Sequence, residues 1–173
     1  MPQPVKGRLP LRARDGSVRD YALVDATDFD WLNQWRWSLG SHGYAWRNTR
    51  LDNRKGRAIL LHRAILGLEH GDPRFGEHRD RNPLNCRRSN LRIAERGHAD
   101  NQQNRGLDAS NTSGYRGVCW HKQRRKWLAY VMLAGRQHSL GLHDTAERAD
   151  AVARAFRAEH MPFSEDAALA VAA

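Results

Sequence analysis

The chain has 173 residues, of which 29 are Lys or Arg and 19 are Asp or Glu, so its formal net charge is +10. This length suits one ordinary domain or two small ones, and no apolar run reaches the roughly 18 residues that a membrane-spanning helix needs. The first residues lack the apolar core of a secretory signal, and two cysteines are too few for a disulfide framework or a CxxC zinc site. We therefore expect a cytoplasmic, basic protein, and its many Arg side chains suit the phosphate oxygens of nucleic acid.

The first half of the chain shows short strand signals around one helical segment. Alternating residues between turns predict strands at 9–14, 21–24, 37–39, 44–49 and 57–61. A helix is expected from Thr27, as its cap, to Trp35, with Phe29, Leu32 and Trp35 on one face. A helical turn is expected at 64–68.

The second half predicts a three-stranded antiparallel sheet with one helix laid on it. The expected strands are 115–120, 126–133 and 136–142, and Ala134-Gly135 forms the second turn. Asp144 is the expected helix cap, because Glu147 follows at the capping-box spacing. The helix would then bury the residues at the i, i+3, i+4 and i+7 positions, which are Ala149, Val152, Ala153 and Phe156.

A polar, turn-prone stretch at 104–114 separates the two halves. Such a run has little to bury and is typical of a linker. The charge also changes there, from 20 basic and 12 acidic residues in 1–107 to 9 and 7 in 108–173. We therefore expect two domains, 1–107 and 108–173, in an α+β protein.

The stretch GEHRDRNPLNCRRSNLR at 76–92 carries the chemistry of the first domain. Glu77 beside His78 places a hard oxygen ligand next to a base that is neutral near pH 7. Neighbours on a strand point to opposite faces, so these two need a loop or a bend to share a site. Asn90 is then expected to reach the imidazole. A helix at about 95–105 would present His98, Asn101 and Arg105 on one face.

These residues resemble the HNH endonucleases of the His-Me finger group, most closely the phage and intron homing type. The resemblance rests on EH…N…NLR…NxxNR, preceded by Leu61-His62-Arg63, and covers residues 21–105 with the upstream ALVD…DFDWLNQWRW segment. It implies a ββα-metal fold and hydrolysis of DNA phosphodiester bonds. Products with 5′-phosphate and 3′-hydroxyl ends would follow.

The resemblance also implies a role for each residue of the motif. His78 would be the general base, Asn90 would orient it, and Glu77 would hold one divalent metal ion. Asn101 matches the family's helix ligand, and His98 competes with it because the segment after Asn90 is longer than usual. Magnesium suits the oxygen ligands best, with manganese as the alternative.

Arginines around the motif are expected to contact the DNA backbone. They are Arg79, Arg81, Arg87, Arg88, Arg92 and Arg105. His62 is expected to be a buried structural residue rather than a ligand.

The second half resembles the plant ethylene-response-factor DNA-binding domain, of the Apetala type. The matching segments are NTSGYRGVCWHK at 111–122, Lys126-Trp127 and LGLHDTAE at 140–147. The resemblance implies a sheet laid in the major groove, with Arg116 and Gly117 matching the family's YRG. Tyr130 stands on the middle strand where plant members carry a charged residue. The first hairpin tip is expected to contact phosphates through Lys122, Arg124, Arg125 and Lys126.

Together these features predict a metal-dependent DNA endonuclease that acts on double-stranded DNA as a monomer or homodimer. The alternative is a non-catalytic DNA-binding regulator whose nuclease site has decayed.

Overall fold

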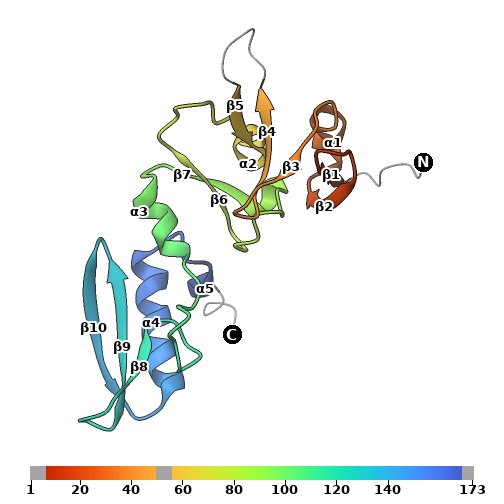
Figure 1. Cartoon of the computed structure of the whole chain (residues 1–173). Coiled ribbons are helices and arrows are strands. Elements are labelled where there is room, and N and C mark those ends of the chain that lie inside the picture. The colour runs from red at the N-terminus through yellow and green to blue at the C-terminus, as the bar shows by residue number, and fades with distance from the viewer. Residues whose placement is uncertain (1–6, 50–55, 169–173) are drawn as a thin grey trace. The chain divides into compact units, whose positions relative to one another are not determined.

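The computed structural model describes residues 7–49 and 56–168 (Figure 1). The chain folds into two compact units, 1–97 and 98–173, and both mix short strands with helices. The expected α+β class is therefore confirmed. No helix among the described residues is long and apolar enough to cross a membrane.

Among its described residues, the first unit contains three small sheets and two short helices. β1 (Arg8–Arg12) pairs with β2 (Val18–Leu23), and β3 (Ser38–Leu39), β4 (Ala45–Thr49) and β5 (Arg57–Leu60) form an antiparallel sheet. The third sheet pairs β6 (Phe75–His78) with β7 (Leu91–Ala94). The helices are α1 (Ala26–Leu32) and α2 (Leu61–Ile65), and a 3₁₀ turn spans Arg88–Asn90.

Apolar side chains from β1, α1 and α2 pack into one core around Trp37. Phe29 and Leu32 are buried there as expected, but Trp35 is 37% exposed. The α1 helix begins after Asp25 and ends at Leu32, so Trp35 lies beyond the helix and does not share its buried face. The helical turn expected at 64–68 is found slightly earlier in the chain, as helix α2 at Leu61–Ile65.

In the second unit, β8 (Val118–His121), β9 (Lys126–Leu133) and β10 (Arg136–His143) form an antiparallel sheet with β9 in the middle. The long helix α4 (Ala146–His160) covers one face of this sheet, as Figure 1 shows. Two further short helices are α3 (His98–Asn101), followed by a 3₁₀ turn, and α5 (Glu165–Ala168). The expected sheet with one helix laid on it is present.

Small side chains allow α4 to lie close to the sheet. Ala149 and Ala153 are fully buried against Ala129 and Val131 of β9. Val152 is 37% exposed, so its expected burial is wrong.

The N-cap of α4 is Thr145 rather than Asp144. The Thr145 side chain accepts a hydrogen bond from the Arg148 backbone N–H, 3.2 Å away. Asp144 instead forms an ion pair with Lys126 at 3.0 Å.

The expected boundary at 107/108 also differs from the observed division at Gly97/His98. The segment 98–107 belongs to the second unit because polar contacts tie it there. The Gln103 carbonyl accepts a hydrogen bond from Arg116 at 2.9 Å, and its side-chain oxygen accepts one from the Phe163 N–H at 3.1 Å. Gln103 is 5% exposed, so these contacts lie in the interior.

Candidate functional site

The β6–β7 hairpin carries the predicted base and its neighbouring carboxylate. Glu77 stands opposite Arg92, and His78 stands opposite Leu91. His78 is the last residue of β6, so the polar loop 79–90 begins directly after it. Strand periodicity does not reveal these two short strands, because Arg, Asn and Asp interrupt the pattern on both sides.

His78 lies in a buried cluster of aromatic and sulfur-containing side chains. Its ring centroid lies 4.8 Å from that of His62 and 5.9 Å from that of Tyr44. Burial lowers the pKa of His78 to about 4, although the Asp80 carboxylate opposes this shift. Burial likewise lowers the pKa of His62 to about 3, helped by the charges of His78 and Arg63. Both imidazoles are therefore neutral at pH 7.

Cys86 is a part of this cluster that the sequence analysis missed. Its Sγ lies 3.6 Å from Nε2 of His78 and 3.7 Å from the Pro83 carbonyl oxygen. Cys86 is fully buried, and burial raises the pKa of its thiol to about 12. The neutral thiol is thus a weak hydrogen-bonding neighbour for the imidazole rather than a nucleophile. Only contact in three dimensions identifies it, since its sequence surroundings contain no cysteine motif.

Asn90 holds the loop that follows His78. Its amide N–H groups donate to Asp80 Oδ1 at 2.8 Å and to the Asn85 carbonyl at 2.7 Å, and its Oδ1 accepts from the Asp80 N–H at 3.0 Å. Its backbone carbonyl accepts from the Arg79 N–H at 2.8 Å. We expected Asn90 to reach the imidazole, but its amide hydrogen bonds go to the loop. It therefore acts on His78 by fixing the residues that follow it.

Glu77 forms an ion pair on the hairpin. Its Oε2 accepts from Arg92 Nε at 2.9 Å, and both side chains are largely buried. Its Oε1 is buried with no hydrogen-bond partner among the described residues. The partners of Glu77 thus differ from those of His78, as they should for neighbours on a regular strand. Strand β6 has no bend at this point that would give Glu77 and His78 the same neighbours.

The expected helix ligands, His98 and Asn101, lie on α3 in the second unit. His98 is exposed and its Nε2 lies 2.8 Å from Nε2 of Gln102, while Asn101 is half-buried. The structure therefore places Glu77 and His78 on one hairpin of the first unit, whereas His98 and Asn101 belong to the second unit. Within 7–49 and 56–168, no three His, Cys, Asp or Glu side chains are grouped to hold a metal ion.

Most arginines around the motif are exposed, and among them Arg88 also tethers two parts of the first unit. Its guanidinium donates to both carboxylate oxygens of Asp28 at 2.8 Å, and its backbone N–H donates to Asp25. It joins the 79–90 loop to α1, so the expected phosphate contact does not describe its main partner. The other exposed arginines are Arg79, Arg81, Arg87 and Arg105, the last paired with Asp108 at 3.3 Å.

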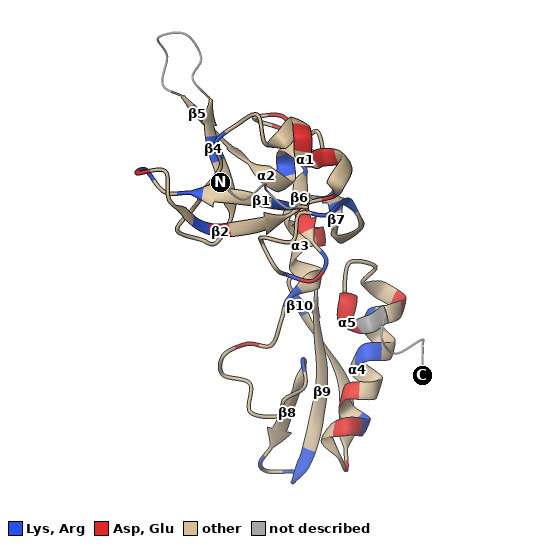
Figure 2. Ribbon diagram, turned by 90° about the vertical axis from the view of Figure 1, so that its right-hand side faces the viewer, with Lys and Arg blue, Asp and Glu red and all other residues tan. Residues whose placement is uncertain are grey.

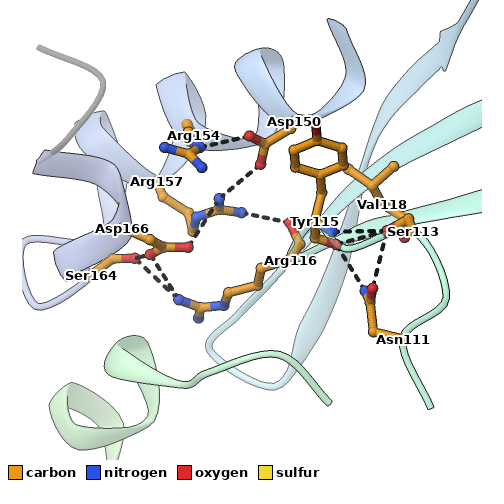
Figure 3. Close-up of polar contacts among 10 residues, drawn as sticks. All are labelled: Asn111, Ser113, Tyr115, Arg116, Val118, Asp150, Arg154, Arg157, Ser164 and Asp166. Atoms are coloured by element: carbon orange, nitrogen blue, oxygen red, sulfur yellow. Dashed lines mark hydrogen bonds and ion pairs between the residues drawn. The ribbon is translucent and has the colours of Figure 1, made fainter. Parts of the chain in front are cut away.

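Arg116 faces the interior of the second unit, as Figure 3 shows. Its Nη1 lies 3.1 Å from Asp166 Oδ1 and 3.2 Å from Ser164 Oγ, and its Nη2 donates to the Gln103 carbonyl. The other carboxylate oxygen of Asp166 lies 3.1 Å from the guanidinium of Arg157, which is 1% exposed. The donors of Arg116 already bind α5, Ser164 and the segment before β8, so the predicted DNA contact would require Arg116 to leave these partners.

Gly117 has a structural role at the start of β8. Its φ is +76°, and a Cβ atom there would lie 2.2 Å from the Tyr130 carbonyl oxygen. Any side chain at this position would push β8 away from β9, which gives the glycine a structural reason.

Most of the basic side chains at the tip of the β8–β9 hairpin are exposed to solvent. Lys122, Arg124 and Arg125 are exposed, while Lys126 forms an ion pair with Asp144. Tyr130 is half-buried on the face of the sheet opposite α4. These positions are compatible with the expected contacts.

No protein-family model matches the chain, and no solved structure matches it. Over 88 residues the chain is 36% identical to a protein named Protein 3.8, from Escherichia phage T7. That alignment spans 51% of this chain and 71% of the phage protein. The chain therefore belongs to the family of Protein 3.8 of Escherichia phage T7.

Proposed function

We propose that the protein is a metal-dependent DNA endonuclease of the HNH, homing type, which acts in a bacterial or phage-infected cell. The observation that carries this proposal is the position of His78 at the end of β6, directly before a loop that Asn90 fixes through Asp80 and Asn85. A base that takes a proton from water must be neutral, and burial lowers the pKa of His78 so that it is neutral at pH 7. The hairpin β6–β7 followed by α3 also has the order of a ββα-metal motif.

The β6–β7 hairpin carries a buried carboxylate oxygen that suits a divalent cation. Glu77 Oε1 has no hydrogen-bond partner within the described part of the chain, and carboxylate oxygens are the preferred ligands of Mg²⁺. Glu77 would hold the ion, with Mn²⁺ as the alternative metal. When bound, the ion would stabilise negative charge on the phosphate and on the leaving 3′ oxygen.

The protein's own residues would perform the remaining steps. His78 would accept a proton from the attacking water, and the loop fixed by Asn90 would hold the imidazole in place. Arg79, Arg81 and Arg87 would contact backbone phosphates beside the site. The second unit would supply affinity for double-stranded DNA through the tip of the β8–β9 hairpin, which carries Lys122, Arg124 and Arg125.

The test is nicking of supercoiled plasmid, with and without Mg²⁺, under single-turnover conditions. His78→Ala should slow cleavage by about 10²–10⁴-fold, the usual loss when a general base is removed. DNA affinity should remain nearly unchanged, because phosphate contacts dominate it. His42→Ala is the matched control, since His42 is an exposed histidine of the same unit. Unchanged cleavage in His78→Ala would overturn the mechanism.

A second candidate function is a non-catalytic DNA-binding regulator. The ion pair between Glu77 and Arg92 favours it, because a carboxylate already neutralised by Arg is a weaker metal ligand. The same assay separates the two functions. A regulator would bind DNA and cut none, whatever the Mg²⁺ concentration.

A further inference from the structure

The face of the β8–β10 sheet opposite α4 carries one charged side chain along β9 and β10, Lys126, which stands at the end of β9 next to the β8–β9 turn. Ala129 and Val131 of β9 point to α4, so the residues that alternate with them point away. The cross-strand pairs Met132–Gln137, Tyr130–Ser139 and Leu128–Leu142 then continue this open face onto β10. The open face consists of Leu128, Tyr130, Met132, Gln137, Ser139 and Leu142.

This open face is accessible to a partner. Met132 is 51% exposed and Leu142 is 37% exposed, and Gln137 and Ser139 are also exposed. Apolar side chains thus stand beside one amide and one hydroxyl on the same surface. A sheet face that served only the fold would have no need to expose a Met and a Leu together.

Basic residues gather at one end of the open face. Lys122, Arg124 and Arg125 lie at the β8–β9 turn and Lys126 begins β9, whereas Arg136 pairs with Leu133, which packs on the α4 side. Figure 2 shows β9 without charge along its length and with a basic residue at the end next to the β8–β9 turn. No acidic residue occurs from 115 to 136. An uncharged surface with basic residues at one end suits DNA, because the surface can lie against base edges while the basic residues contact the neighbouring phosphates.

The chemistry of the open face selects among base pairs. Guanine is read in the major groove chiefly by Arg or Lys. The open face has neither between its strand ends, and Lys126 at its end pairs with Asp144 at 3.0 Å. Gln pairs with the N6 and N7 edge of adenine, and apolar side chains contact the C5 methyl group of thymine. We propose that the open face reads A·T base pairs, with Met132 and Leu142 on thymine methyl groups and Gln137 on adenine. This inference rests on the proposed function only in requiring that the second unit bind duplex DNA.

The test measures binding of the full chain to four 30-base-pair duplexes at fixed salt, in EDTA so that no cleavage occurs. Two duplexes alternate A with T or A with U, and two alternate G with C or G with 5-methylcytosine. Replacing T with U removes only the methyl group, and we expect about tenfold weaker binding, the loss of roughly two methyl contacts. The 5-methylcytosine duplex should bind more tightly than its unmethylated counterpart for the same reason.

Variants assign the effect to the open face. Met132→Ala and Leu142→Ala should each reduce the ratio of A·T to A·U affinity, while Gln137→Ala should reduce the preference for A·T over G·C. Val152→Ala is the matched control, because Val152 has the same 37% exposure as Leu142 but lies on α4. Urea unfolding of each variant verifies that it is folded.

The possible outcomes separate this inference from the proposed function. Equal affinity for A·T and A·U duplexes, or tighter binding to G·C, would overturn the inference while leaving DNA binding in place. Failure to bind any duplex would overturn the proposed function and the inference with it. Self-association that Met132→Ala abolishes would assign the open face to a second copy of the chain and would also overturn the inference.

Discussion

Asn90 and Asp80 hold each other through two hydrogen bonds across the base of the loop that follows His78. The Asp80 N–H donates to Asn90 Oδ1 at 3.0 Å, and Asn90 Nδ2 donates to Asp80 Oδ1 at 2.8 Å. Burial raises the pKa of Asp80, but hydrogen bonds from Asn85, Asn82 and Asn90 outweigh it, so the pKa lies below its usual value. The ionised carboxylate thus stays available to accept all three.

Asn90→Ala should therefore destabilise the first unit and slow nicking together. The variant leaves the Asp80 N–H and the Asn85 carbonyl without their partners, at a cost of about 1–3 kcal/mol in the free energy of unfolding. Urea unfolding followed by Trp fluorescence measures that cost. Ser89→Ala, at the exposed neighbouring position, is the control and should match the wild type. A nicking rate in Asn90→Ala equal to that of the wild type would show that the loop does not position His78.

The sequence predicts the second unit far better than the first. In β9 the side chains alternate regularly, and the Ala134-Gly135 turn has positive φ at both residues, so local signals determine the sheet. The buried alanines of α4 also follow helical spacing. Such agreement arises where neighbours in sequence are also neighbours on one face of an element.

The candidate site is predicted only in part, because its geometry depends on distant contacts. Sequence identifies His78 and Glu77, but not that Arg92 neutralises Glu77 from the paired strand. Cys86 becomes a neighbour of His78 only after the 79–90 loop folds back. The interior role of Arg116 is equally hidden, since its partner Asp166 lies 50 residues further along the chain. An ion pair with that separation leaves no local pattern.

Stability should fall in acid because of His78 and His62. Their folded pKa values, about 4 and about 3, lie below the usual value of 6.5, so the unfolded chain binds protons that the folded chain does not. The contribution of the neutral, buried histidines to the free energy of unfolding is therefore complete above pH 6.5, and it is lost as the pH falls below that value. Each histidine should cost about 2 kcal/mol at pH 5 relative to pH 7.5. Urea unfolding at both pH values measures the loss. His62→Gln should show a smaller loss than the wild type, and an equal loss would assign the pH dependence elsewhere.

Nicking should persist at lower pH than an ordinary histidine base allows. With its pKa near 4, His78 remains unprotonated at pH 5.5, whereas a histidine with pKa 6.5 would be mostly protonated. Rates measured from pH 5.5 to 8, with DNA saturating and folding checked at each pH, should vary by less than about threefold from this ionisation. A half-maximal rate near pH 6.5 would mean that bound DNA or metal restores the usual pKa of the imidazole.

Asp166→Ala should destabilise the second unit without direct effect on catalysis. The change leaves the buried Arg157 with Asp150, 3.8 Å away, as its remaining ion-pair partner, and it removes one partner of Arg116 (Figure 3). Breaking a buried ion pair from one side costs about 3–5 kcal/mol. Thermal unfolding compares the variant with Glu159→Ala, which removes a carboxylate that is 76% exposed. A similar midpoint in the two variants would show that the Arg116–Asp166–Arg157 cluster contributes little.

Glu77→Gln should change the metal requirement of nicking, whereas His78→Ala should change the rate at every metal concentration. The side-chain amide introduced by Glu77→Gln can still accept from Arg92 but is a weaker ligand for Mg²⁺ than a carboxylate. The Mg²⁺ concentration for half-maximal nicking should rise by at least about tenfold, and excess Mg²⁺ should restore much of the rate. No Mg²⁺ concentration should restore His78→Ala, because its deficit is a missing proton acceptor. A titration of both variants from micromolar to millimolar Mg²⁺ separates the two roles. If Glu77→Gln lowered the maximal rate but left the Mg²⁺ midpoint unchanged, Glu77 would be only the structural partner of Arg92.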